Sequence, residues 1–472
     1  MDLYRIIFEY YIFIYVALSC SLYLLLGFSA YLGIRRYKTQ NSENDQNIIF
    51  DAPDAPGISV VAPAFNEAKT IIENVKSLMT LNYPVYEIII INDGSSDDTL
   101  ELLINEFDLV ETPFAYLEKI AVPSFKRVLK SKKSKYSELT VVDKTNTGTK
   151  ADAVNAGINA SSNYPYFLFT DVDCILNRNT LINMIKPVLN SKVRTVAVGS
   201  SLWMSNGCKV HNGKIIKIAP PKKIIPRFQV IEYLRAYLLG KMGWSFINAV
   251  PNVSGALALY DKEIVTACGG YDTNSHAEDM DIMIRVAAYM IQNKLPYKIE
   301  YIPSVCCYTE GPANVKILGR QRTRWASGLA QIFTTHREKF FNYRFKKIGF
   351  IVFPLTFLFE FLAPIIEFIG LIYFISLLLF GTINWPLFGY TFLFSYTFGI
   401  SIGTLMLVYE QYVKQNYSSI HDKLKVWIML LFEPFLYHPI LVYFSIKGYL
   451  NFFLSRKVEW GKMTREGFKK SS

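Results

Sequence analysis

The chain has 472 residues, more than one ordinary domain, and 51% of them are hydrophobic. Its net charge of +11 is compatible with nucleic acid or with a surface that faces anionic lipid. The sequence carries no nucleic-acid-binding motif and has long apolar segments, so we expect a membrane and no nucleic acid as its partner. The six cysteines are scattered without a Cys-x-x-Cys pair, which disfavours a zinc site.

The first apolar segment, residues 11–34, contains no charged residue and is long enough to cross a membrane once. A signal peptide is the alternative, but the segment is too long and lacks an evident small-residue cleavage site. Arg35, Arg36 and Lys38 follow it, and basic residues flank spans on the cytosolic side.

Short apolar runs and helical patterns then alternate through a central block, from about residue 51 to residue 343. The runs at 58–62, 86–91, 139–143 and 166–170 predict strands, and the spacing at 67–79, 97–107 and 150–160 predicts helices. This alternation is typical of a mainly parallel α/β sheet. Residues 108–136 are rich in lysine and poor in pattern, and we expect a solvated basic insertion there. The absence of Gly-x-Gly-x-x-Gly and of a phosphate-binding loop motif disfavours a dinucleotide dehydrogenase and an ATPase.

Polar residues follow the predicted strands, at the edge where parallel sheets bind ligands. They include Asn66-Glu67, Asn92-Asp93 and the pair Asp171-Val-Asp173. Two carboxylates at a strand end suit Mg²⁺ or Mn²⁺, although Asp-x-Asp alone is equally typical of a solvated turn. Lys150 opens a helix, where it could meet a diphosphate.

Two further clusters lie later in the block. Glu278 and Asp279 open a predicted helix, which the helix dipole alone would explain, but Asp279 lies over Ile282 and Met283 and would there become more basic. The residues Gln321, Arg324, Trp325 and Gly328 share one helical stripe. An amphipathic basic helix on a membrane surface is the simpler interpretation of this stripe, and a site for a sugar and a diphosphate is the alternative.

The C-terminal part is again apolar. Residues 368–409 carry no charge and allow two crossings that turn near 381–386. Residues 348–366 fit an interfacial helix at least as well as a span, and residues 426–446, interrupted by Glu433-Pro434 and His438-Pro439, predict a broken or re-entrant segment. Arg344, Lys346 and Lys347 precede this group, so both ends of the central block are expected in the cytosol.

Seven motifs now occur in a recognisable order: Pro63-Ala-Phe-Asn-Glu67, Asn92-Asp93-Gly-Ser-Ser-Asp97, Lys150-Ala-Asp152, Asp171-Val-Asp173, Ser254-Gly-Ala256, Glu278-Asp279 and Gln321-Arg-Thr-Arg-Trp325. With its flanking apolar segments, the chain resembles the membrane-bound family 2 glycosyltransferases, which include cellulose, chitin, hyaluronan and poly-N-acetylglucosamine synthases. The resemblance implies a glycosyltransferase-A fold, a Rossmann-like cytosolic domain flanked by transmembrane helices. It also implies inverting transfer from a nucleotide sugar with Mg²⁺ or Mn²⁺.

The resemblance also assigns roles to residues. Asp279 would be the general base, and Asp171 and Asp173 would hold the metal. The nucleotide sugar, expected to be a UDP-sugar, would lie against Pro63, Asn66, Glu67, Asp93, Lys150 and Asp171. The acceptor and the leaving diphosphate would lie against Glu278, Gln321, Arg322, Arg324 and Trp325. Two features depart from the family pattern: Ala277 replaces the usual threonine, and no Phe-x-Val-Thr gating loop is evident, for which Trp460–Arg465 is a candidate substitute.

We therefore expect a multi-pass protein of the plasma membrane in three parts: residues 1–50 with one span, the cytosolic catalytic domain 51–343, and residues 344–472 with interfacial and transmembrane helices and a basic tail. The favoured function is a polysaccharide synthase that forms β-linkages and exports its product, with room for an accessory export subunit. The alternative is a non-processive enzyme that adds one sugar to a membrane lipid.

Overall fold

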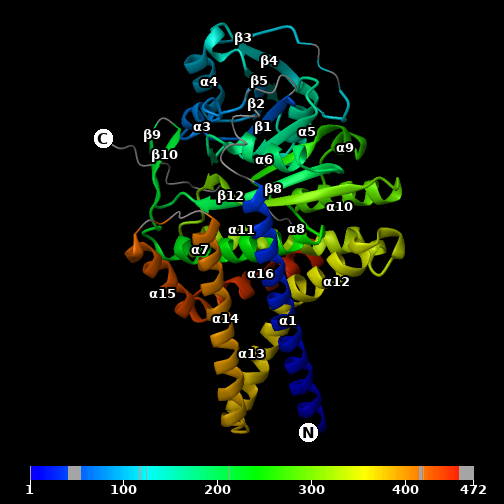
Figure 1. The fold of residues 1–472 in the computed structure, drawn as a ribbon, viewed down its shortest axis with the longest axis vertical. Helices are drawn as coiled ribbons and strands as arrows, with labels where there is room; N and C mark the ends of the chain where they lie inside the picture. The colour runs from blue at the N-terminus through cyan, green and yellow to red at the C-terminus, as the bar shows by residue number, and fades with distance from the viewer. Residues whose placement is uncertain are drawn as a thin grey trace.

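The computed structural model describes residues 2–40, 55–114, 116, 118–123, 125–211, 213–413, 417 and 419–456. A ten-stranded mixed sheet forms its upper part, and apolar helices extend away from it (Figure 1). The sheet order is β3-β4-β5-β2-β1-β6-β11-β8-β12-β7. The strands are β1 Ile58–Ala64, β2 Tyr86–Asp93, β3 Leu109–Glu111, β4 Phe125–Ser131, β5 Leu139–Lys144, β6 Tyr166–Thr170, β7 Ile175–Leu176, β8 Arg194–Met204, β11 Leu257–Asp261 and β12 Tyr297–Thr309, with a separate hairpin of β9 Lys209–His211 and β10 Lys214–Lys217.

The centre of the sheet is parallel, as the alternation of strands and helices predicts. β1 pairs in parallel with β2 and β6, and β2 pairs in parallel with β5. β2 contains four consecutive isoleucines, and all four are buried. This is the pattern of a strand that is covered on both faces. Helix α5 (Lys150–Ala160) covers β1 and β2, and its Gly157 is required because a Cβ there would come within 2.5 Å of Val61. The predicted mainly parallel α/β fold is confirmed.

Two predictions for the central block are wrong in detail. Residues 108–136 are not only a solvated insertion, because β3 and β4 extend the sheet through antiparallel pairing of β4 with β5. Strands near a sheet edge commonly carry lysines, which hides their pattern. The helix predicted over 67–79 is confined to α3 (Ile71–Leu78), because Asn66 adopts a left-handed conformation (φ 57°) and residues 68–70 form a turn.

The other helices of the upper part lie around the sheet and beneath it. They are α4 Thr99–Phe107, α6 Thr180–Leu189, α7 Ile224–Leu234, α8 Met242–Phe246, α9 Lys262–Ala267, α10 Glu278–Gln292 and α11 Val315–Thr335. In Figure 1, α7, α11 and the C-terminal α16 (His438–Phe453) lie between the sheet and the projecting helices. α16 packs along α11 at two glycines: a Cβ at Gly319 would meet the Phe444 ring at 2.2 Å, and a Cβ at Gly448 would meet the Thr323 carbonyl at 2.5 Å.

Three helical segments in the described ranges are long and apolar enough to cross a membrane: Glu9–Gln40 within α1 (Asp2–Gln40), Ile348–Leu379, and Trp385–Val413, which is α14. Ile348–Leu379 contains α12 (Phe353–Thr356) and α13 (Ala363–Leu379), with a break at Leu362. α13 and α14 are the two helices predicted within 368–409, with their turn at 380–384. α15 (Ile420–Leu436) and α16 meet at an angle of 50°, so the expected break in 426–446 is present.

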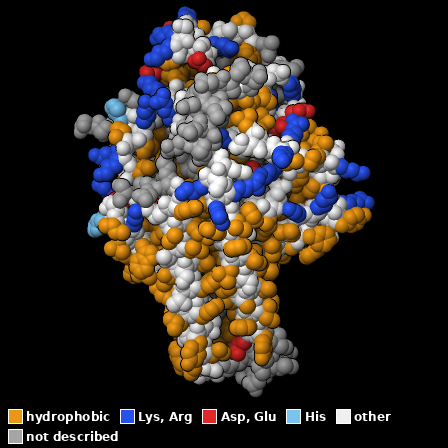
Figure 2. All heavy atoms as spheres, viewed as in Figure 1, with side chains coloured by type: hydrophobic (Ala, Val, Ile, Leu, Met, Phe, Trp, Pro, Cys, Tyr) orange, Lys and Arg blue, Asp and Glu red, His pale blue; other side chains and the backbone are white. Residues whose placement is uncertain are grey.

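Figure 2 shows the surface that this arrangement creates. Apolar side chains cover the projecting helices, and lysine and arginine side chains gather in a band where these helices meet the sheet domain. Such a band is typical of the boundary between a hydrocarbon layer and anionic headgroups.

Candidate active site

The parallel strands β1, β2 and β6 end at one edge of the sheet, and the predicted site residues begin there. The loop after β1 is tied to the loop after β2: the Asn66 amide N donates to the Ser95 Oγ at 3.1 Å, and the Ser96 amide N donates to the Asn66 Oδ1 at 2.8 Å. The Glu67 amide N donates to the Thr99 Oγ1 at 2.9 Å. Asn66 and Glu67 therefore hold these two loops together beside the half-buried Pro63.

Asp93, at the end of β2, is buried against a lysine that sequence reasoning missed. The Lys144 Nζ donates to the Asp93 Oδ1 at 2.7 Å and lies 2.6 Å from the Asp152 Oδ2, and Asn146 donates to the Asp93 Oδ2 at 3.1 Å. Burial raises the pKa of Asp93, and the Lys144 ammonium opposes this shift. A lysine at the end of a predicted strand was the available signal, because a buried ammonium requires carboxylate partners.

Lys150 lies at the centre of the second part of the site. Its ammonium forms an ion pair with Asp171, donates to the Gly255 carbonyl at 2.9 Å, and lies 3.9 Å from the Glu278 Oε1. It also lies over the Phe169 ring, 4.6 Å from the centroid. Residues from α5, β6, the loop before β11 and α10 therefore meet around one cation.

The two acids that open α10 differ in burial. Asp279 is only half buried, and its Oδ2 accepts a hydrogen bond from the Asn252 amide at 3.3 Å. Glu278 is the buried carboxylate. Burial raises the pKa of Glu278, Lys150 opposes the shift, and the neighbouring Asp279 adds to it. The reason is that the first turn of α10 directs Glu278 toward Lys150 in the protein interior.

The strand-end pair Asp171 and Asp173 was tested for its fit to a divalent cation. Asp171 keeps 31% of its side chain exposed, and Asp173 is buried. In the part of the chain that the structure describes, no group of three or more His, Cys, Asp or Glu side chains could hold an ion alone. Two carboxylates nevertheless fit Mg²⁺ or Mn²⁺, which commonly complete their shells with phosphate oxygens and water.

Helix α11 carries the Gln321/Arg324/Trp325 stripe and docks on the start of α10. A Cβ at Gly328 would come within 2.9 Å of the Ala277 side chain, so this glycine sets the approach of the two helices. Gln331, one further turn along α11, accepts from the His276 amide N at 2.8 Å and donates to the Asn274 carbonyl at 2.8 Å. Sequence reasoning missed Gln331, for which only its helical spacing from Arg324 and Gly328 was a signal.

The stripe itself faces the acid cluster. Burial and then the positive charge of Arg324 lower the pKa of His276, and Arg324 also acts on Glu278. The Gln321 Oε1 is buried without a hydrogen-bond donor among the described residues. Trp325 is 40% exposed, so its ring is accessible to a ligand.

Arg322, expected with the diphosphate, has a different environment. Its guanidinium pairs with the Glu232 carboxylate of α7, with Nη2 to Oε2 at 2.9 Å, and lies over the Trp325 ring at 4.3 Å from the centroid. The Tyr437 hydroxyl donates to the same carboxylate at 2.6 Å. Arg322 is one residue removed from the stripe, about 100° around the helix, and it therefore points toward α7 and the junction of α15 with α16.

The fold and site define a glycosyltransferase-A domain joined to apolar helices. Residues 59–113 match the model of Glycosyl transferase family 2, and residues 222–446 match the model of Glycosyl transferase family group 2. The chain belongs to glycosyltransferase family 2.

Among its relatives is poly-beta-1,6-N-acetyl-D-glucosamine synthase of Staphylococcus epidermidis, 28% identical over 272 residues, which are 58% of this chain and 54% of the relative. The chain thus spans about half the length of that protein. The probable glycosyltransferase YdaM of Bacillus subtilis is 26% identical over 72% of this chain and 70% of its own length. The structure of mannosyltransferase PcManGT from Pyrobaculum calidifontis, in complex with GDP-Man and Mn²⁺, has the same fold, with a TM-score of 0.50, 17% identity, and coverage of 93% of this chain and 99% of that one.

Proposed function

We propose that the protein transfers a sugar from a nucleotide sugar to a hydroxyl acceptor with inversion, and that it builds a β-linked polysaccharide that is exported. One observation carries the proposal. The Lys150–Asp171–Glu278 cluster, the Asp279 carboxylate and Arg324 of the α11 stripe lie close enough together to interact electrostatically around Glu278. The relationship to a poly-β-1,6-N-acetylglucosamine synthase supports a polymer as the product.

The donor side of this proposal uses the carboxyl edge of the sheet. Asp93, held by Lys144, would contact the nucleotide base, and the tied loops at Pro63–Glu67 would line the nucleotide. Lys150 would donate to the diphosphate while it neutralises Asp171. A Mg²⁺ or Mn²⁺ ion bound by Asp171 and Asp173 would offset the negative charge that develops on the leaving diphosphate.

The acceptor side uses α10 and α11. Asp279 would take the proton of the attacking hydroxyl, an effect of about 10²–10⁴-fold in a positioned base. The Asn252 amide holds one oxygen of this carboxylate and leaves the other for the acceptor. Displacement by a hydroxyl that a single carboxylate activates inverts the anomeric carbon, so an α-linked donor would give a β-linkage.

The α11 stripe would bind the leaving diphosphate and the acceptor sugar. Arg324 supplies a guanidinium for the leaving diphosphate, and the exposed Trp325 ring supplies a platform for the acceptor sugar. The Gln321 Oε1 on this stripe is buried without a donor among the described residues, and a sugar hydroxyl would satisfy it. Glu278 sets the position of Lys150 between the two halves of the site.

The product decides between the favoured function and its alternative. Purified protein is incubated with radiolabelled UDP-glucose, UDP-N-acetylglucosamine or GDP-mannose, and nucleotide release identifies the donor. With that donor, membranes should form material of high mass that a β-specific glycosidase cuts, and membranes with Asp279→Asn should not. A single lipid-soluble product that carries one sugar would overturn polymerisation and establish a lipid glycosyltransferase.

We also propose that residues 51–343 form the cytosolic catalytic domain of a multi-pass plasma-membrane protein, with an accessory export subunit as a candidate partner. The basic residues on both sides of this block and the band in Figure 2 support this orientation. Ser134 is exposed on the sheet domain. In a background without other cysteines, Ser134→Cys in intact cells should react only with a membrane-permeant reagent. Labelling by an impermeant reagent would show that this domain lies outside the cell and would contradict the proposed orientation. Trp460–Arg465 and most of the basic tail lie outside the described residues.

A further inference from the structure

A pocket that is open to solvent lies at the end of α1, where this helix leaves the apolar part of the molecule. It is bounded by α1, α8, the end of α6 and the start of β12. The residues that matter for its chemistry are Gly33, Arg36, Asn190, Met242, Phe246 and Lys298. We call it the juxtamembrane pocket; it contains none of the residues assigned above to the active site.

The upper wall of the juxtamembrane pocket carries an excess of positive charge. Arg36 is exposed, and its guanidinium has no hydrogen bond or ion pair with any described residue. Lys298 forms an ion pair with Glu300. Burial lowers the pKa of Lys298, and repulsion from Arg36 lowers it further. One acid for two cations leaves a net positive charge, and a guanidinium binds phosphate oxygens in a bidentate manner.

The lower wall is apolar and continues onto the surface of a membrane-spanning helix. Gly33 lets α1 approach α8 closely, since a Cβ at Gly33 would come within 3.2 Å of the Met242 side chain. Phe246 is 42% exposed beside this contact, and Phe28 is 64% exposed on α1. Phe28 is eight residues before Arg36, about 12 Å along the helix axis. A ligand with a phosphate at Arg36 and an acyl chain along α1 would match both walls.

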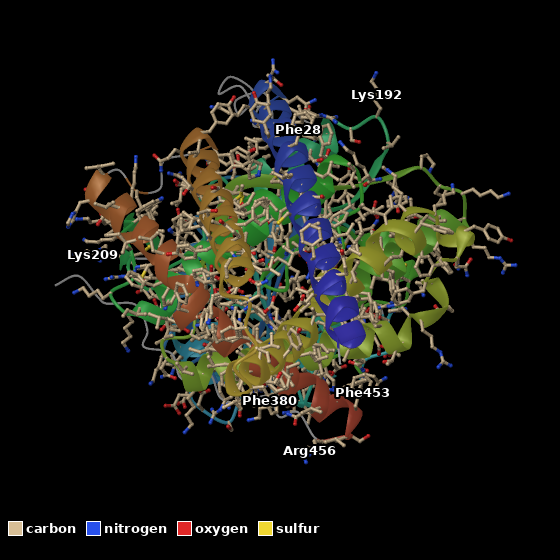
Figure 3. The ribbon with its side chains drawn as sticks, turned by 90° about the horizontal axis from the view of Figure 1, so that it is seen from below. Phe28, Lys192, Lys209, Phe380, Phe453 and Arg456 are labelled. Carbon is tan, nitrogen blue, oxygen red and sulfur yellow. The ribbon has the colours of Figure 1, made fainter. Side chains whose placement is uncertain are left out.

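The position of the pocket agrees with a lipid ligand. Arg36 lies near the C-terminal end of the candidate span Glu9–Gln40, four residues before its last residue. Lys192, two residues after Asn190, points away from the body of the molecule when it is seen from below (Figure 3). The exposed Asn190 side chain can supply a further donor.

We propose that the juxtamembrane pocket binds the phosphate of an anionic phospholipid, with an acyl chain against Phe246 and α1. The proposal does not depend on the sugar or the acceptor of the transferase. Arg36 would form the phosphate contact, and Lys298 would add long-range attraction.

The test uses the full chain, delipidated in detergent, and native mass spectrometry with added dioleoyl phosphatidylglycerol or phosphatidylcholine. Wild type should retain phosphatidylglycerol in preference to phosphatidylcholine. Arg36→Gln should weaken phosphatidylglycerol binding about tenfold, because a charge-assisted bidentate contact is lost. Arg35→Gln is the matched control: it removes the same charge from the adjacent position, which is also exposed and does not line the pocket. It should change binding less than about twofold.

Four further outcomes would each contradict the proposal or a part of it. Equal weakening by Arg35→Gln and Arg36→Gln would show non-specific attraction to the basic band and overturn the proposal. Equal retention of both lipids by wild type would overturn it as well. Displacement of phosphatidylglycerol by millimolar inorganic phosphate or glycerol phosphate would assign the pocket to a soluble phosphate ligand instead. Phe246→Ala should weaken dioleoyl but not dihexanoyl phosphatidylglycerol, and equal effects on both would refute the acyl contact.

Discussion

The Arg322–Glu232 pair offers the sharpest test of how α11 is built into the protein. Arg322 is 8% exposed, and its guanidinium shares the Glu232 carboxylate with the Tyr437 hydroxyl while it lies over the Trp325 ring. Glu232→Gln would leave a buried guanidinium without its counter-charge. Arg322→Gln would leave a carboxylate with only the tyrosine as its donor. The structure therefore predicts a loss of stability in both variants, and no direct effect on the nucleotide sugar.

The magnitude follows from burial. Removal of one partner of a buried ion pair costs about 3–5 kcal/mol, and we expect about 3 kcal/mol here because Glu232 keeps 24% of its side chain exposed. Thermal unfolding in detergent, followed by tryptophan fluorescence, should show melting temperatures lowered by several degrees in each single variant. The double variant should lose less than the sum, with a coupling of about 2 kcal/mol. Arg320→Gln, an exposed arginine on the same helix, is the control and should stay within about 0.5 kcal/mol of wild type.

Donor binding distinguishes the structural role of Arg322 from a role at the diphosphate. At a temperature where all variants are folded, affinity for the nucleotide sugar should be unchanged within about twofold. If Arg322→Gln loses donor binding while Glu232→Gln is stable and binds normally, Arg322 contacts the diphosphate and the reasoning from the ion pair fails.

Four more variants test the acids of the site. Asp171→Asn or Asp173→Asn should abolish transfer and the metal dependence of donor binding in calorimetry, whereas full transfer by wild type in excess chelator would refute the metal site. Asp279→Asn should bind donor normally but transfer sugar at least about 100-fold more slowly, and a loss of donor binding would make Asp279 a nucleotide ligand. Glu278→Gln should raise the melting temperature at neutral pH, because the pKa of Glu278 is raised in the folded protein. The wild-type fold therefore gains stability as the pH falls toward 4.5, the pKa of this group in the unfolded chain. The variant should lose this pH dependence of stability. An unchanged profile would contradict the burial argument.

Much of the fold is predictable because its signals are local. β1, β2, β5 and β6 are short runs of apolar residues between polar loops, and α5 spans the predicted residues 150–160. The long uncharged segments predict the long apolar helices in the same way, since about 20 apolar residues have few alternatives to a membrane. β3 and β4 were missed because the pairing of β3 with β4 and of β4 with β5 joins residues that are separated along the chain, and the lysines of β4 resemble those of a loop.

The candidate site shows where local information ends. The order of motifs along the chain was sufficient to name Asp171, Asp279 and Arg324, because each motif is a short run of residue types with a recognisable chemistry. The sequence could not separate Arg322 from Arg324, or Glu278 from Asp279, because adjacent residues of the same charge differ only in direction. The direction of each side chain matters only in the folded protein. There Glu232 of α7 pairs with Arg322 on one face of α11, and Lys150 of α5 lies near Glu278 in the first turn of α10. Burial and charge pairing depend on segments that are far apart in the chain, so only the tertiary structure decided which acid is buried and which arginine is bound.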